Sequence, residues 1–141
     1  MEQNINYVTY IVATGQIRNK GNCLPDVFER KIPRPGTALL QVSSVDHKVQ
    51  YVDTVTDTII DRPVMGSSID KTTITANASD TATVSDIPVG TRLQLWRFNS
   101  LLFDTVVDDG EFGLTVMETG TYTIKLTNFP DQDEEYSVDG I

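Results

Sequence analysis

The chain has 141 residues, 39% of them hydrophobic, which suits one globular domain or two small lobes. Its 11 basic and 20 acidic side chains give a net charge of −9, so its surface repels phosphate and nucleic-acid binding is not expected. No apolar run is long enough to cross a membrane, and the first residues lack a signal-peptide pattern. We therefore expect a protein made in the cytoplasm without membrane contact. The single cysteine, Cys23, excludes an internal disulfide.

Short strands and turns are predicted through the first half. Residues 7–13 are rich in β-branched and aromatic side chains, and the Thr14-Gly15 turn leads into a partner strand at 16–19. Residues 21–35 contain three prolines and one possible helical turn at 26–30, so they are expected to form a long surface connection. Further strands are expected at the following ranges, the last two joined by a turn at 54–57: 38–42, 49–53 and 58–61.

A boundary is expected at residues 66–70, because this segment is short and polar and precedes a new run of alternating residues. The predicted lobes are therefore residues 1–65, a β-hairpin lobe with a Pro-rich arm, and residues 66–141. The second lobe is expected to begin with strands at 71–78 and 81–86, around a turn at 78–80.

The stretch from Asp86 to Pro130 carries the clearest strand pattern. Leu93 and Leu95 alternate with Arg92, Gln94 and Trp96, which is the period of a strand. The turn residues 108–110, Asp-Asp-Gly, predict a hairpin between residues 101–107 and 112–116. Residues 121–127 alternate again. The pattern favours an all-β fold in which seven short strands make the second lobe an immunoglobulin-like antiparallel sandwich.

Charge suggests one interaction surface. Residues 1–64 hold seven basic and seven acidic side chains, whereas residues 65–141 hold four and thirteen. The basic group Arg30, Lys31 and Arg34 is a candidate to meet an acidic neighbour, such as the second lobe of another copy. The alternative is a solvated loop.

A second candidate surface lies at Trp96, Arg97 and Phe98. Trp and Arg are enriched at binding hot spots, so these residues could anchor a partner. The alternative is that Trp96 packs in the core or between the lobes.

The residues offer little catalytic chemistry. Cys23 and His47 are the one thiol and the one imidazole, and a nucleophilic pair would also need a third group to orient the histidine. Neither can form a zinc site, which takes several Cys or His at short spacing. Two acidic clusters could supply oxygen ligands for calcium, but turns and solvated loops are the favoured interpretation: Asp108, Asp109 and Glu111, and Asp131, Asp133, Glu134 and Glu135. We expect no enzyme, no cofactor and no metal site.

Taken in order, several short motifs resemble a family of small tailed-bacteriophage virion proteins, found alone or as the first part of tail-fibre proteins. The motifs are Thr14-Gly15, Cys23, Tyr51-Val52-Asp53, Arg62-Pro63, Pro88-x-Gly90 and Gly120-Thr121-Tyr122. The chain departs from the family pattern at Thr54, where the turn often carries glycine. The resemblance covers nearly the whole chain and implies a structural role in a phage particle, with no catalytic residue.

The expected function is a virion structural protein in the tail or neck that attaches tail fibres. Other phage structural proteins and further copies of the chain are the expected partners. Two alternatives remain open. One is a capsid decoration protein, and the other is a receptor-binding or carbohydrate-binding module of the fibre, with Trp96, Phe98 and Tyr136 as its candidate aromatic platform.

Overall fold

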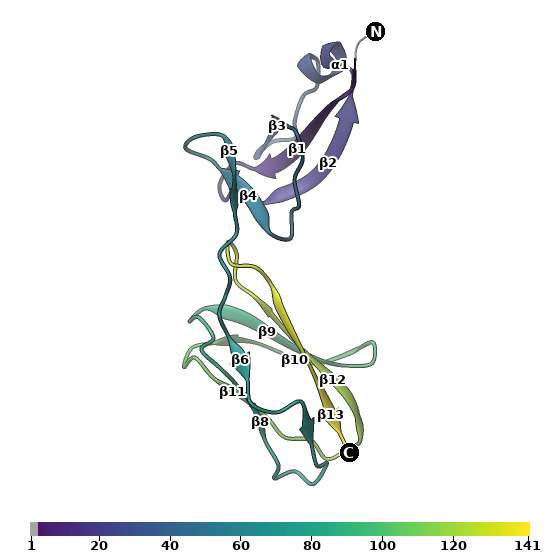
Figure 1. Cartoon of the computed structure of the whole chain (residues 1–141), viewed down its shortest axis with the longest axis vertical. Coiled ribbons are helices and arrows are strands. Elements are labelled where there is room, and N and C mark those ends of the chain that lie inside the picture. The colour runs from purple at the N-terminus through teal and green to yellow at the C-terminus, as the bar shows by residue number, and fades with distance from the viewer. Residues whose placement is uncertain (1–2) are drawn as a thin grey trace. The chain divides into compact units, whose positions relative to one another are not determined.

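The computed structural model describes residues 3–141, and the chain divides into two compact units: unit 1, residues 1–63, and unit 2, residues 64–141. Each unit is described by itself. The fold is mostly β, with several antiparallel sheets and one short helix among the described residues (Figure 1). The division falls two residues before the predicted boundary. None of the helical structure within residues 3–141 is long and apolar enough to cross a membrane.

Unit 1 contains a three-stranded antiparallel sheet in the order β2-β1-β3. Its strands are β1 (Ile5–Ile11), β2 (Ile17–Cys23) and β3 (Thr37–Val42). The predicted first hairpin is confirmed, although β2 runs four residues further than expected, so the connection to β3 begins after Cys23. That connection holds the helix α1 (Pro25–Glu29), where the helical turn was predicted.

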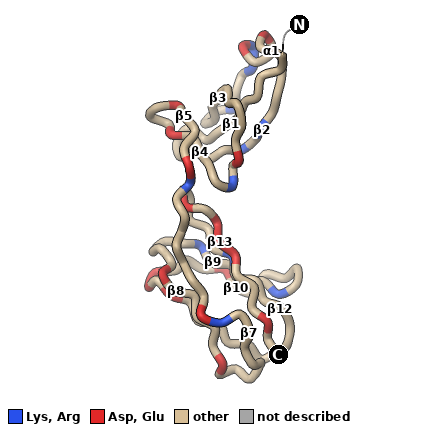
Figure 2. The backbone as a smooth tube through the Cα atoms, in the orientation of Figure 1, with Lys and Arg blue, Asp and Glu red and all other residues tan. Residues whose placement is uncertain are grey.

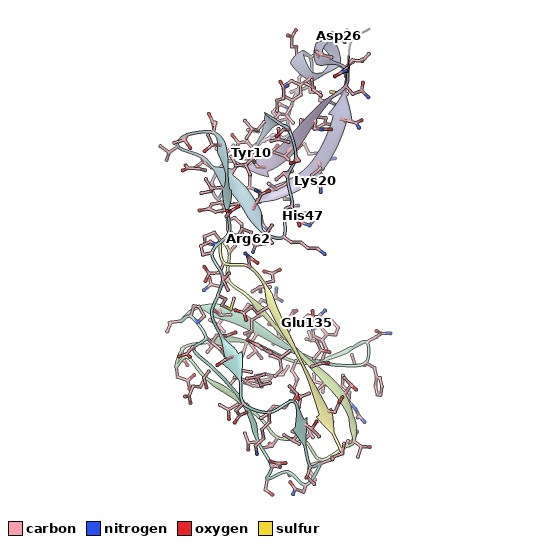
Figure 3. All side chains as sticks on the ribbon, in the orientation of Figure 1. Tyr10, Lys20, Asp26, His47, Arg62 and Glu135 are labelled. Atoms are coloured by element: carbon pink, nitrogen blue, oxygen red, sulfur yellow. The ribbon has the colours of Figure 1, made fainter. Side chains whose placement is uncertain are left out.

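A second hairpin completes unit 1, as predicted. It pairs β4 (Gln50–Asp53) with β5 (Thr58–Asp61). The small core consists of Val8, Tyr10, Ile17 and Val52. Tyr10, labelled in Figure 3, donates a hydrogen bond from its hydroxyl to Oδ1 of Asp57 at 3.2 Å. The β4–β5 turn is thereby tied to the central strand of the sheet.

Unit 2 contains two sheets. A five-stranded sheet has the order β10-β9-β12-β13-β7, and a three-stranded sheet has the order β11-β8-β6. All pairings are antiparallel except that of β13 with β7, which is parallel. The strands are β6 (Ser68–Ile69), β7 (Thr73–Ile74), β8 (Ala82–Ser85), β9 (Thr91–Arg97), β10 (Ser100–Val107), β11 (Phe112–Leu114), β12 (Gly120–Thr127) and β13 (Glu134–Gly140).

Both sheets of unit 2 contribute to a single hydrophobic cluster. Val84 and Leu114 enter it from the smaller sheet, and Leu93, Ile124 and Val138 enter it from the larger one. The predicted alternation on β9 is present, because Leu93 and Leu95 are buried while Arg92 is exposed. We call the face of the larger sheet that carries Leu93 and Leu95 its inner face, and the opposite face its outer face.

The predicted hairpin at residues 108–110 is wrong. Strand β10 pairs with β9, and β11 pairs with β8, so the Asp-Asp-Gly turn carries the chain from one sheet to the other. Gly110 has a φ of +81°, and its carbonyl accepts a hydrogen bond from the backbone of Ile87. The turn chemistry was interpreted correctly, but the pairing was not. Residues 98–99 form the actual two-residue hairpin turn, between β9 and β10.

The start of unit 2 also differs from the prediction. Strands β7 and β8 were expected around one turn, but they lie in different sheets. The segment between them is instead held by Asn77, whose Oδ1 accepts hydrogen bonds from the backbone of Ser79 and Asp80. Eight strands are described in this unit, not seven.

Candidate protein-interaction surfaces

A basic groove lies on unit 1, on the sheet face opposite the core. It has a volume of about 540 Å³ and is lined by the cationic side chains Arg18, Lys31 and Arg34. Tyr7, Leu39 and Ile32 add apolar surface to its lining. We call these six residues the basic groove.

The groove is shaped by the segment that follows α1. Pro25 occupies the first turn of that helix, and Phe28 packs against Tyr7 with ring centroids 5.7 Å apart. The Nζ of Lys31 lies 5.2 Å from the Tyr7 ring centroid, within the range of a cation–π contact. The chain then turns back to the sheet, where the Thr37 backbone and hydroxyl both donate to the Arg34 carbonyl. Local contacts therefore fix the groove wall.

The predicted basic group is only partly brought together. Lys31 and Arg34 line the groove, but Arg30 does not. Its guanidinium pairs with Asp26, labelled on α1 in Figure 3, with 3.2 Å between Nη2 and Oδ2. Arg18 takes its place in the groove from β2. Sequence inspection missed Arg18 because it lies in a different strand, at the bulge where the β1–β2 register shifts.

Phe98 forms the tip of the β9–β10 hairpin in unit 2. Its φ is +54°, which is rare for a bulky side chain, and the residue is 77% exposed. The Arg97 guanidinium lies 5.5 Å from its ring centroid. A strained backbone that presents an aromatic ring to solvent is a feature that clusters at functional sites. Phe98 is the strongest of the predicted anchor residues.

Trp96 and Arg97 point to opposite faces of the sheet, so the three predicted residues do not form one continuous patch. Trp96 is half-buried on the outer face, with the Nζ of Lys125 5.3 Å from its ring centroid. Arg97 lies at the end of the inner face, where it pairs with Glu118, donates to the Thr119 carbonyl at 2.7 Å and lies over the Tyr122 ring. Arg97 therefore supports the structure beneath the hairpin tip.

Strand β10 is an edge that sequence inspection did not single out. In the part of the chain described, it pairs with β9 alone. Four large apolar side chains along it are exposed, and we call them the apolar edge: Leu101, Leu102, Phe103 and Val106. Edge strands are commonly protected from pairing with another chain by lysine or other charges, by proline or by a β-bulge. β10 has no lysine or proline, and its protection is limited to Asp104 and the register shift between Leu101 and Phe103. The sequence analysis placed residues 101–107 in a hairpin with residues 112–116, and that pairing would not have left the strand at this edge.

The aromatic platform expected for a sugar site is not assembled as predicted. The hydroxyl of Tyr136 lies 2.7 Å from the Ser67 hydroxyl and donates to Glu134 at 2.8 Å. The residue packs against the core of unit 2, away from the outer face. Burial is the largest effect on the pKa of Tyr136 and raises it. The hydrogen bond with Ser67 lowers this pKa, and the hydrogen bond and charge of Glu134 raise it. Trp96 and Phe98 do line one shallow depression of about 230 Å³.

Acidic residues, red in Figure 2, occur in both units, and thirteen of the twenty belong to unit 2. Asp108, Asp109 and Glu111 are exposed. Within residues 3–141 no group of three or more His, Cys, Asp or Glu side chains is placed to hold a metal ion. Cys23 is half-buried at the end of β2, and His47 lines a small depression beside Arg18.

No protein-family model and no curated protein matches the sequence.

Proposed function

We propose that the chain is a structural protein of a bacteriophage particle, where it joins tail or neck components to tail fibres. The resemblance of its ordered motifs to small tailed-phage virion proteins supports this role. The structural observation that carries the proposal is that two β units, each with its own core, each present a separate surface suited to protein contacts. An adaptor needs two such surfaces.

We further infer that unit 2 has an immunoglobulin-like arrangement. Two sheets share one core, and successive strands pass between them. The first strands are divided between the sheets, since β6 joins the smaller one and β7 runs parallel to β13 in the larger one. Rigid β modules of this type are commonly used to display contact surfaces on loops and edges.

The apolar edge is the proposed site at which unit 2 joins its neighbour. An extended segment of a partner can add to an exposed strand through backbone hydrogen bonds, and the side chains of the edge then give specificity. Phe98 at the adjoining hairpin turn supplies an exposed aromatic side chain of the kind that is enriched at protein interfaces. Unit 1 would meet a different component.

Cross-linking of intact particles at lysine, followed by mass spectrometry, tests the adaptor role. Unit 1 offers Lys20, Lys31 and Lys48, and unit 2 offers Lys71 and Lys125. An adaptor should cross-link to a tail or neck protein from one unit and to a fibre protein from the other. Cross-links from both units to the major shell protein would instead establish the decoration role. Absence of the chain from purified particles would refute a virion role altogether.

A further inference from the structure

The basic groove has three cations whose charges are not balanced nearby. Arg18 and Arg34 are exposed, Lys31 is half-buried, and none of the three forms an ion pair with any residue of the described range 3–141. No carboxylate lines the groove in that range. Apolar surface lies beside the charges, because Ile32 is 92% exposed. This combination suits an acidic segment of a protein that also carries apolar side chains.

Unit 2 carries a segment of that chemistry. The residues Asp108, Asp109, Gly110 and Glu111, which we call the acidic turn, place three exposed carboxylates within four positions. The turn is held in one conformation, since the Glu111 backbone donates to Oδ1 of Asp109 at 3.2 Å and Ile87 donates to the Gly110 carbonyl. Val106, 61% exposed, lies two residues before it. A fixed turn loses little conformational entropy on binding.

We propose that the basic groove of one copy binds the acidic turn of a second copy. Three cations would meet three carboxylates, and exposed apolar side chains lie on both sides of the contact. The two surfaces belong to different units, so the contact is heterologous: each copy offers a groove to one neighbour and a turn to another. Repetition of such a contact builds a ring or a filament. The inference rests on the proposed function for the premise that several copies lie together in one particle.

A second copy is favoured over nucleic acid or an anionic lipid surface as the occupant. The charges of residues 1–64 balance, with seven basic and seven acidic side chains, so a second copy brings its acidic unit 2 to a unit without net charge. Nucleic acid and an anionic lipid surface are polyanions throughout and would also repel the −9 carried by residues 65–141. The acidic turn is a compact local anion that can approach the groove without bringing a long phosphate backbone with it.

The salt dependence of self-association separates this contact from non-specific association. Ionic strength screens attraction between exposed charges, with a Debye length of about 10 Å at 0.1 M and about 3 Å at 1 M. Contact between groove and turn should therefore weaken as salt rises. Association through apolar surface alone should strengthen, because salt would screen the repulsion between two chains of charge −9.

The experiment is sedimentation equilibrium of the full chain and two charge-reversed variants, at low and high salt. One variant combines Arg18→Glu with Arg34→Glu, and the other combines Asp108→Lys with Glu111→Lys. None of these four side chains supports its unit through a described hydrogen bond. Each variant alone should associate more weakly than the unaltered chain, by roughly tenfold or by a larger factor. Their equimolar mixture should associate again, because one variant keeps an intact groove and the other an intact turn.

A matched control shifts the net charge as much as the groove variant does. Lys48→Glu combined with Lys125→Glu reverses two exposed cations outside both the basic groove and the acidic turn, so it should associate like the unaltered chain apart from added repulsion. The turn variant is less negative than the unaltered chain, so reduced repulsion alone would strengthen its association.

Three results would overturn the inference: a chain that stays monomeric into the millimolar range, association that strengthens with salt, or a mixture that does not recover. If the basic groove instead binds an acidic segment of another protein, the purified chain should stay monomeric, which is the first of these results. All three results are measured on the purified chain. They therefore do not decide the proposed virion role, which is tested separately on intact particles.

Discussion

Gly15 and Val52 lie so close together that a side chain at Gly15 would overlap the carbonyl oxygen of Val52. The Val52 backbone donates a hydrogen bond to the Gly15 carbonyl at 2.9 Å. Gly15 also has a φ of +80°, which disfavours any residue with a Cβ. This contact joins the β1–β2 turn to the second hairpin, so it holds the two halves of the small unit 1 core together.

Substitution of Gly15 by alanine should destabilise unit 1 strongly. The positive φ costs about 1 kcal/mol, and the overlap with β4 should add roughly 2 kcal/mol more. Urea unfolding monitored by circular dichroism measures the change. Gly36→Ala is the matched control, because Gly36 has the same φ of +80° and no atom lies within 4 Å of the position of its Cβ. Equal losses for the two variants would show that the contact with Val52 contributes nothing.

Replacement of Phe98 by glycine should stabilise the isolated chain while weakening its contact with a partner. Relief of the positive φ should add about 1 kcal/mol to the free energy of unfolding. Loss of the exposed ring should weaken binding to a fibre or tail component. Thermal unfolding and a binding titration with the cross-linked partner measure the two effects. Asn99→Gly is the control at the same turn, where φ is not positive. A destabilised Phe98→Gly would mean that the ring packs for stability.

Local patterns predicted the strands better than their partners. The alternation on β9 and the β4–β5 hairpin follow from side-chain period and turn chemistry, which act over a few residues. The Asp109-Gly110 turn was assigned to a hairpin because a positive-φ glycine indicates a reversal, yet a reversal between sheets needs the same backbone. The true hairpin at Phe98 was missed because its turn has no glycine.

Only part of the candidate surfaces could be predicted, because local patterns act over a few residues and do not specify which strands become neighbours. Lys31 and Arg34 are neighbours in sequence, and their shared segment made them visible. Arg18 joins them through the register of β1 and β2, which no local pattern specifies. The apolar edge could not be predicted without the order of strands in the sheet, because an exposed edge strand and a buried strand can have the same apolar sequence.

Removal of the Tyr10 hydroxyl should change the alkaline stability of unit 1. Burial first, then the charge of Asp57 and its hydrogen bond, raise the pKa of Tyr10 above its usual value near 10. Its stabilisation is therefore complete below about pH 10 and is lost as pH rises through the raised pKa. Tyr10→Phe should lose about 1 kcal/mol at neutral pH and should show a shallower decline at alkaline pH, measured by urea unfolding at stepped pH. An unchanged alkaline slope would contradict the contact with Asp57.

Asp104 should support unit 2 above acidic pH. Hydrogen bonds from Arg92 and then Gln94 lower the pKa of its carboxyl. The contribution is present above about pH 4, the unfolded value, and is lost as pH falls through the lowered pKa. Asp104→Asn should therefore reduce the loss of stability on acidification, with a small effect because the pair is partly exposed. Thermal unfolding at stepped acidic pH measures it, with the exposed Glu135→Gln as control.

The position of the chain in an intact phage particle is the most direct test of the proposed function. Purified particles would be labelled with a gold-tagged antibody against the chain and viewed by electron microscopy. The adaptor role predicts gold at the neck or tail, beside the origin of the fibres. Gold spread over the capsid, or particles that lack the protein, would contradict it.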